Sequence, residues 1–334
     1  MERFKLKILL VDYYMEYMNP TDKLTLEILV DIADELSIYG FGYVNFETLQ
    51  KGLRNFIKEN GPFDLIFTNE RVLLSKNAQI WAEPSKRDIK KSFVSHFNLQ
   101  TITEPIVNEI IDTLSFFSDK LIIFMLQTDF YNFRESSVKL LNDLPKSKII
   151  SFGKDLISQV NKCANLKYEK FFEHTQDNWY NFSVKNDKRI CSIPHFISLS
   201  EIFWGQVSNR DYDLAIPGVD YYARKEVLKA AKNENINLAP SYTRKFNIAN
   251  RIGINVYGSK LGIITSQTLF KQNIAKSKVA FTCGSALNWP LRKFFEIPAF
   301  GSVLICMPFK NAEQHGFIDN ETCFMISNTS DFIP

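Results

Sequence analysis

A single carboxylate, Glu296, stands in an otherwise apolar stretch of the chain, RKFFEIPAFGSVLIC at 292–306. On a helix with about 100° between residues, Arg292 and Glu296 lie one turn apart and away from the apolar stripe. That stripe contains Leu287, Leu291, Phe294, Phe295 and Pro298. Aromatic anchoring would hold Glu296 rigidly, so that its carboxylate can accept hydrogen bonds from hydroxyl groups. The alternative is an i,i+4 pair between Arg292 and Glu296 on a solvated helix face, which contributes roughly 0.2–0.5 kcal/mol.

Other residues with useful chemistry follow apolar strands of the first half or lie between the two halves. Asp129 comes directly after LIIFMLQT and is a candidate general base or orienting group for a hydroxyl. Asp12 and Asn69 occupy similar strand ends and are weaker candidates. For each of them the alternative is an Asx turn or a helix cap. His195 lies in the segment PHFISLSEIFWGQVSNR, where it is a second candidate for catalysis, with a structural role as the alternative.

Composition and missing motifs exclude several classes of protein. The chain has 334 residues, is 45% hydrophobic and carries a net charge of +3, which is compatible with small polyanionic ligands and too mild to indicate nucleic acid. It has no G-x-x-x-x-G-K, no G-x-G-x-x-G after the first strand and no G-x-S-x-G, which argues against ATPases, simple dehydrogenases and α/β-hydrolases. DYD at 211–213 opens a strand and is interpreted as structural. The five dispersed cysteines favour a reducing compartment and show no zinc spacing.

Apolar strands alternate with helical stretches along the chain, which is typical of a parallel sheet covered on both faces. The pattern runs to about residue 194 and restarts near residue 211. We therefore predict an α/β protein with two Rossmann-like domains, 1–200 and 201–334, that face each other across a cleft. Ligands bind at the carboxyl ends of such strands. The expected strands are 6–12, 63–69, 120–129, 148–153, 188–194, 211–218, 254–259, 276–283 and 302–308, and the expected helices are 24–37, 106–117, 222–236 and one around 290–300.

Several segments resemble one enzyme family. NWPLRKFFEIPAFGSVLIC at 288–306, followed by HGFIDNETCF at 315–324, is similar to the C-terminal domain of GT-B glycosyltransferases, in particular the CgeB-like, spore-maturation-type branch. CSIPHFISLSEIF at 191–203 resembles the joint between the two domains of these enzymes, and DLAIPGVDYYARKEVLKAA at 213–231 resembles the first strand, loop and helix of their C-terminal domain. The resemblance covers 190–330, and the rest of the chain matches only in pattern.

The resemblance implies roles for individual residues. In retaining GT-B enzymes the second Glu of an E-x7-E pair holds the ribose hydroxyls of the nucleotide, and Glu296 matches it; the first position is Asn288 here, a weaker candidate for sugar contacts. Backbone N–H groups, helix N-termini and cations, not a metal, would meet the diphosphate charge. The candidates for that role are Arg224, Arg292, Lys293, Gly284 and Ser285. The alternatives are solvated helix positions for the cations and a plain turn for the last two residues.

The resulting prediction is a metal-independent glycosyltransferase without a cofactor, acting in polysaccharide biosynthesis. It would transfer a sugar from a nucleotide-sugar donor to a glycan or lipid-linked acceptor, with no nucleic acid as partner. The alternatives are a non-catalytic nucleotide- or sugar-binding module of a larger protein and a GT-B-like nucleotide-sugar epimerase. No apolar run reaches 18 residues, so we expect a cytoplasmic protein, and peripheral membrane contact stays open. GT-B chains end in a helix that crosses back to the N-terminal domain, and we expect the segment ending in SDFIP to lack it.

Overall fold

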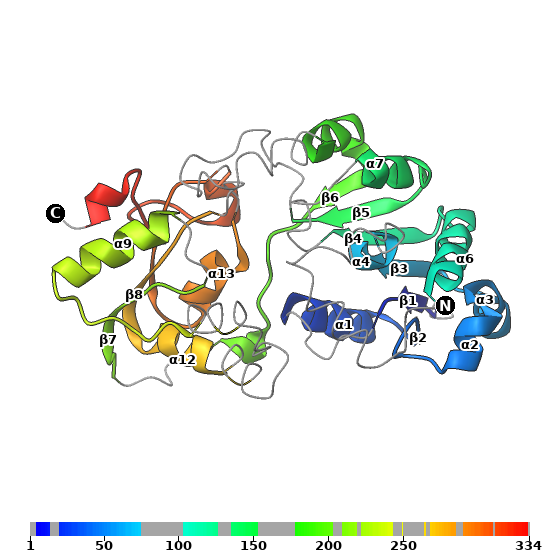
Figure 1. Cartoon of the computed structure of the whole chain (residues 1–334), viewed down its shortest axis with the longest axis horizontal. Helices are drawn as coiled ribbons and strands as arrows, with labels where there is room; N and C mark the ends of the chain where they lie inside the picture. Colours follow the sequence, from blue (N-terminus) through cyan, green and yellow to red (C-terminus); the bar gives the residue numbers. More distant parts are fainter. Residues whose placement is uncertain are drawn as a thin grey trace. The chain divides into compact units, whose positions relative to one another are not determined.

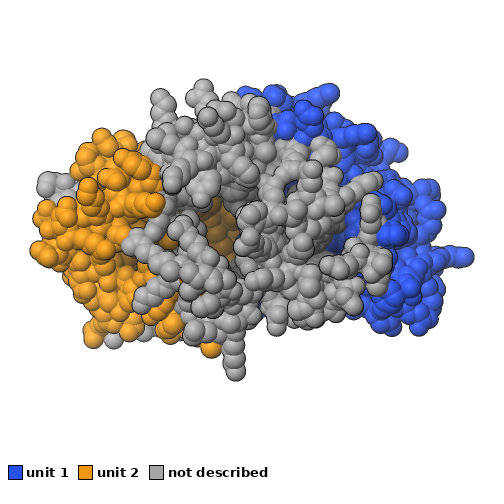
Figure 2. Space-filling view, viewed as in Figure 1, with its two compact units in different colours: residues 1–154, 177–193 blue, residues 155–176, 194–334 orange. Residues whose placement is uncertain are grey.

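The structure is a computed structural model of the 334-residue chain. It describes residues 5–13, 20–74, 103–125, 135–152, 178–202, 209–218, 222–242, 249, 264, 268–284, 290–309 and 311–332. The chain divides into two compact units, residues 1–154 with 177–193 and residues 155–176 with 194–334 (Figure 2). We call them unit 1 and unit 2 and describe each by itself. None of the helices among the described residues is long and apolar enough to cross a membrane.

Unit 1 is built on a six-stranded parallel sheet with the strand order β2-β1-β3-β4-β5-β6 (Figure 1). β1 is buried along most of its length because its run of apolar residues, KILLV, has to be covered on both faces of the sheet. The strands of unit 1 are β1 (Lys7–Val11), β2 (Glu35–Tyr39), β3 (Leu65–Asn69), β4 (Leu121–Met125), β5 (Lys148–Ser151) and β6 (Ile190–Ser192).

The helices of unit 1 pack along this sheet. The side chain of Glu109 in α6 accepts hydrogen bonds from the backbone N–H groups of Leu53 (2.8 Å) and Arg54 (3.1 Å), so α6 caps the N-terminus of α3 beside it (Figure 1). The described helices are α1 (Pro20–Ile32), α2 (Phe46–Lys51), α3 (Leu53–Asn60), α4 (Glu70–Leu74), α6 (Thr103–Phe116) and α7 (Glu135–Asn142), and a 3₁₀ turn, η5 (Asp187–Arg189), precedes β6.

One prediction for unit 1 is wrong. The helix expected at 24–37 ends at Ile32, and β2 begins at Glu35. The carboxylate of Asp34 accepts a hydrogen bond from the backbone N–H of Leu6 (2.8 Å), and the chain then pairs with β1 along the edge of the sheet. Pairing with a buried strand therefore outweighs the helical spacing that continues in the sequence.

Unit 2 contains a four-stranded parallel sheet with the order β10-β9-β8-β7. Side chains of successive strand residues point to opposite faces, so Ala280 belongs to the core beside α12 and α13, whereas Phe281 belongs to the core beside α9. The elements of unit 2 are η6 (Leu199–Glu201), β7 (Tyr212–Ala215), α9 (Tyr222–Asn233), α12 (Phe270–Ala275), β8 (Ser277–Thr282), α13 (Arg292–Ala299), β9 (Val303–Cys306), η8 (Glu313–His315), β10 (Phe324–Met325) and η9 (Thr329–Phe332).

Two further features of unit 2 bear on the sequence predictions. The aspartates of the DYD stretch form ion pairs with lysines at the start of β8, Asp211 with Lys276 (2.9 Å) and Asp213 with Lys278 (2.7 Å), so their contacts are structural. α13 begins at Arg292, two residues after Pro290, and ends before Gly301, which has φ +82°. The strand expected at 254–259 lies outside the described residues.

The cysteines differ between the units. Cys283, Cys306 and Cys323 are buried in unit 2, and burial raises the pKa of the last two thiols. Cys191, in β6 of unit 1, is exposed.

Candidate functional site

Two cations meet around a glycine beyond the carboxyl end of β7. Gly218 has φ +95°, and a Cβ placed on it would lie 2.3 Å from Cε of Lys293 and 3.0 Å from Nη1 of Arg224. Nζ of Lys293 lies 3.1 Å from the same point, so the two nitrogen atoms are no more than about 6 Å apart. The positive φ and the lack of space both require glycine here. We call Gly218, Arg224 and Lys293 the cation site.

Arg224 is fixed by contacts in the core of unit 2. It is in the first turn of α9, is 1% exposed, and its Nη2 donates to Oγ1 of Thr282 at 2.7 Å. Thr282 is the last residue of β8, so the guanidinium is held where this strand ends. The N-terminus of a helix adds partial positive charge at such a place.

The pKa of Lys293 reflects both its burial and the positive charge of Arg224. Burial and the neighbouring Arg224 lower the pKa of Lys293 from 10.5 to about 8, and the opposite influence of Glu296 is smaller. Among the described residues, Lys293 makes no hydrogen bond or ion pair, although its ammonium lies 5.9 Å from the centre of the Phe270 ring. Two cations held together in this way favour an anion, which would remove their repulsion.

Glu296 is buried, in contrast to the solvated helix face that the sequence allowed. The residue is 6% exposed, and Phe294 and Ile297 on the same helix are fully buried. Oε1 of Glu296 lies 3.3 Å from Nε of Arg292, which is the expected i,i+4 pair, but both side chains are about nine-tenths buried. The carboxylate also acts on the pKa of Lys293, so it belongs to the surroundings of the cation site.

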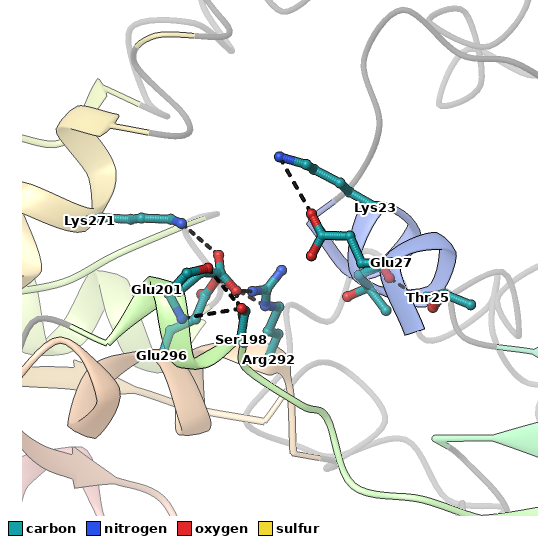
Figure 3. Close-up of polar contacts among 10 residues, drawn as sticks. Lys23, Thr25, Glu27, Ser198, Glu201, Lys271, Arg292 and Glu296 are labelled. Atoms are coloured by element: carbon teal, nitrogen blue, oxygen red, sulfur yellow. Dashed lines mark hydrogen bonds and ion pairs between the residues drawn. The ribbon is translucent and has the colours of Figure 1, made fainter. Parts of the chain in front are cut away.

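Arg292 is directed to a second carboxylate, that of Glu201 in η6 (Figure 3). Its Nη2 donates to Oε2 of Glu201 at 2.6 Å, and Nζ of Lys271 in α12 donates to Oε1 of Glu201 at 2.5 Å. The backbone N–H of Ser198 donates to the same carboxylate at 3.2 Å. Glu201, Lys271, Arg292 and Glu296 thus form a cluster of two acids and two bases, which we call the ion cluster.

His195 lines a cavity of about 370 Å³ in unit 2. Its ring centre is 6.1 Å from that of Phe295, which neighbours Glu296 on α13. Burial, together with the charges of Arg292 and Lys293, lowers the pKa of His195 to about 3, so the imidazole is neutral near pH 7 and a weak base. The cavity is lined by His195, Ile197, Phe295, Pro298, Ala299, His315, Gly316, Phe317 and Thr322.

The remaining predicted residues divide between described and undescribed parts of the chain. Gly284 is buried two residues beyond the end of β8, on the same loop as Cys283. Asp129, Ser285 and Asn288 lie outside the described residues. Within the described ranges, no group of three or more His, Cys, Asp or Glu side chains is placed to hold a metal ion.

The strand ends of unit 1 form a separate polar group. Asp12, which follows β1, makes a buried ion pair with Arg71, in which Nε of Arg71 donates to Oδ1 of Asp12 at 2.7 Å. Asn69 lies at the end of the neighbouring β3, and a small cavity is lined by Asn69 together with Asp12 and Arg71. β1 and β3 flank the point where the strand order of this sheet reverses, which is where ligands bind in open α/β sheets.

Glu201 and Lys271 were not recognised from the sequence. One signal was available, because Ser198 and Glu201 in SLSE have the spacing of a capping box, and the structure contains that box around η6. A capping box indicates a helix start, however, and says nothing about the arginine and lysine that Glu201 binds from α12 and α13.

Comparisons with known proteins add little to this geometry. No protein-family profile matches the chain, and no curated protein matches it. Among solved structures, the chain is similar to one described as "Crystal structure of GtfA/B complex", with 13% sequence identity and a TM-score of 0.32. The match covers 65% of this chain and 50% of that one, so the chain spans half the length of the matched structure. A TM-score this low carries no argument about function.

Proposed function

We propose that the chain is a glycosyltransferase that binds a nucleotide-sugar donor in unit 2 and transfers the sugar to a hydroxyl acceptor. The cation site supports this proposal most strongly. Arg224 and Lys293 converge on one point beside the backbone of Gly218, and burial together with the charge of Arg224 lowers the pKa of Lys293. A diphosphate carries the charge that would match two cations, and the two cations can lie this close together because Gly218 has no side chain.

Each part of the donor has a counterpart in unit 2. The diphosphate would bind Arg224, Lys293 and the N-terminus of α9, and the ribose hydroxyls would bind the carboxylate of Glu296. The cavity beside Phe295 lies next to Glu296 along α13 and has room for an aromatic base. When the bond between the sugar and the diphosphate breaks, the two cations would stabilise the charge that develops on the leaving phosphate. This role requires no metal ion.

A GT-B arrangement of the two units and an acceptor site in unit 1 belong to the same proposal. The carboxyl ends of β1 and β3, beside Asp12 and Asn69, are where an acceptor would bind, because the strand order reverses between these two strands. Asp129 stays a predicted general base. The weak basicity of His195 near pH 7 makes it a lining residue of the donor cavity in this proposal and gives it no part in proton transfer.

Calorimetric titration tests the donor site. Pyrophosphate and the diphosphates of uridine, guanosine, adenosine and cytidine should be titrated into the protein and into Lys293→Met. We expect pyrophosphate and one nucleotide to bind, with affinity at least about tenfold lower in Lys293→Met. Lys229→Met, which removes an exposed lysine from α9, is the matched control and should bind normally.

Turnover distinguishes the proposed enzyme from its alternatives. A transferase is supported if the protein hydrolyses the sugar nucleotide that it binds, or transfers its sugar to an acceptor, and if Glu296→Ala loses this activity. Binding without turnover would indicate a non-catalytic module, and conversion of the donor without transfer would indicate an epimerase. Absence of pyrophosphate and nucleotide binding would refute the proposal.

A further inference from the structure

Arg292 lies between the carboxylates of Glu201 and Glu296, and its contacts with the two differ (Figure 3). Its Nη2 donates to Glu201 at 2.6 Å, whereas its Nε lies 3.3 Å from Glu296 and makes no hydrogen bond. Within the described part of the chain, the carboxylate of Glu296 accepts no hydrogen bond. Arg292 therefore hydrogen-bonds to Glu201, whereas with Glu296 it forms an ion pair through Nε alone.

This difference matters because a guanidinium prefers to bind a carboxylate through two parallel N–H groups. Arg292 and Glu296 are one turn apart on α13, which is the spacing at which such a pair forms. In that arrangement both oxygens of Glu296 would be occupied by Arg292. Hydroxyl groups of a ligand would then have to displace a charged hydrogen bond before they could bind.

Glu201 is well placed to prevent this. Burial would raise the pKa of Glu201, but the hydrogen bond from Lys271 and the charge of Arg292 outweigh it, and the pKa is lowered overall, so the group is ionised near pH 7. Lys271 donates to one oxygen of Glu201, and the other oxygen accepts from Arg292 and from the backbone N–H of Ser198. The capping box at Ser198 fixes η6, and with it the carboxylate.

We propose that Glu201 is a positioning residue that holds the Nη2 end of Arg292, so that Arg292 pairs with Glu296 through Nε alone and leaves the Glu296 carboxylate without a hydrogen bond from this guanidinium, available for the vicinal hydroxyls of a ribose. The inference rests on the proposed function, because it concerns the ribose part of the same donor site. It also changes the predicted role of Arg292, which serves the ion cluster and not the diphosphate.

The test measures ribose recognition separately from phosphate binding. Three probes should be titrated: pyrophosphate, the ribonucleoside diphosphate that binds best, and its 2′-deoxy form. We expect the unmodified protein to bind the ribonucleotide at least about tenfold more tightly than the deoxynucleotide, as the loss of one hydrogen bond to a charged group implies. In Glu201→Gln this preference should fall to about twofold or less, while the affinity for pyrophosphate stays the same.

A second substitution separates positioning from a general effect on folding. In the double variant Glu201→Gln with Arg292→Met, the competing guanidinium is absent, so the preference for ribose should return. A purely structural role of Glu201 predicts further damage instead. Lys278→Met is the matched control, because it breaks an exposed ion pair of unit 2, that with Asp213, outside the ion cluster, and it should keep the preference. If Glu201→Gln does not fold, Glu201→Asp, which shortens the reach to Arg292, carries the same test.

The outcomes distinguish this inference from the function on which it rests. If ribonucleotides are preferred by the unmodified protein and equally by Glu201→Gln, the donor site stands and the role of Glu201 is refuted. If the double variant does not recover the preference, the competition argument is refuted. If neither pyrophosphate nor any nucleotide binds the unmodified protein, the proposed function fails and this inference fails with it.

Discussion

Removing the charge of Lys293 should stabilise the protein in the absence of ligand. The folded state holds this ammonium beside Arg224 in a partly buried place, which lowers its pKa from 10.5 to about 8. Below pH 8 the lysine is therefore charged in both the folded and the unfolded state, and folding carries the full cost of burying the ammonium and placing it beside Arg224. Lys293→Met keeps the length and apolar stem of the side chain and removes this cost.

The size of the effect follows from the pKa. The change from 10.5 to about 8 corresponds to roughly 3 kcal/mol at 1.36 kcal/mol per pKa unit. Lys293 is only half-buried, so solvent screening reduces this to about 1–2 kcal/mol. For a unit of this size, such a gain raises Tm by roughly 2–8 °C. The difference from the unmodified protein should narrow as the pH rises from about 8 towards 10.5, because the unfolded chain then binds more protons than the folded one.

Thermal unfolding followed by calorimetry, with and without pyrophosphate, checks this prediction. Without ligand, Lys293→Met should have a higher Tm than the unmodified protein, and Lys229→Met should have the same Tm as the unmodified protein. Saturating pyrophosphate should raise the Tm of the unmodified protein by mass action and raise that of Lys293→Met less, because a tenfold weaker affinity removes about 1.4 kcal/mol of the stabilisation. A Tm of Lys293→Met equal to or below that of the unmodified protein would refute the claim that folding pays for a charged Lys293 in the cation site.

Three further outcomes are expected. Pyrophosphate affinity, measured by calorimetry, should fall by up to about tenfold per pH unit above pH 8, because Lys293 loses its proton there and only its charged form attracts the anion. An affinity that does not change from about pH 7 to 10 would exclude a role for this ammonium. Asp12→Asn should destabilise unit 1 by about 3–5 kcal/mol in denaturant titrations, because the buried guanidinium of Arg71 loses the carboxylate of Asp12. A loss of unfolding free energy below about 1 kcal/mol would show that solvent reaches the Asp12–Arg71 pair. Phe294→Ala should cost unit 2 about 3–5 kcal/mol because the ring is fully buried, and an unchanged unfolding midpoint would contradict the packing of α13.

The sequence predicted the strands well where they are buried on both faces. The ranges 6–12, 148–153 and 276–283 contain β1, β5 and β8 because continuous apolar runs leave few alternatives. β2 and β10 were missed for different reasons. β2 lies at a sheet edge where the helical spacing of α1 continues, and β10 has only two residues. Whether these segments pair depends on the neighbouring strand, which a local pattern does not contain.

The candidate site was predicted in its parts but not in its contacts. Periodicity placed Glu296 and Arg292 on one side of a helix, but it could not say that this side is buried. The cover comes from η6 and α12, and Glu201 is separated from Arg292 by 91 positions. Likewise, the two cations of the cation site meet only because β7, β8 and the elements after them bring their ends together. Such long-range contacts are set by topology and side-chain packing, neither of which the sequence pattern specifies.

The distribution of cysteines provides a way to follow each unit by itself. A thiol reagent added to the native protein should modify exposed Cys191 at once, whereas Cys283, Cys306 and Cys323 should react only when unit 2 opens. With Cys163 replaced by serine, pulse labelling followed by mass spectrometry would report local opening of unit 2 without an engineered probe. Slower labelling of its three thiols in the presence of pyrophosphate would then measure how far ligand binding suppresses that opening.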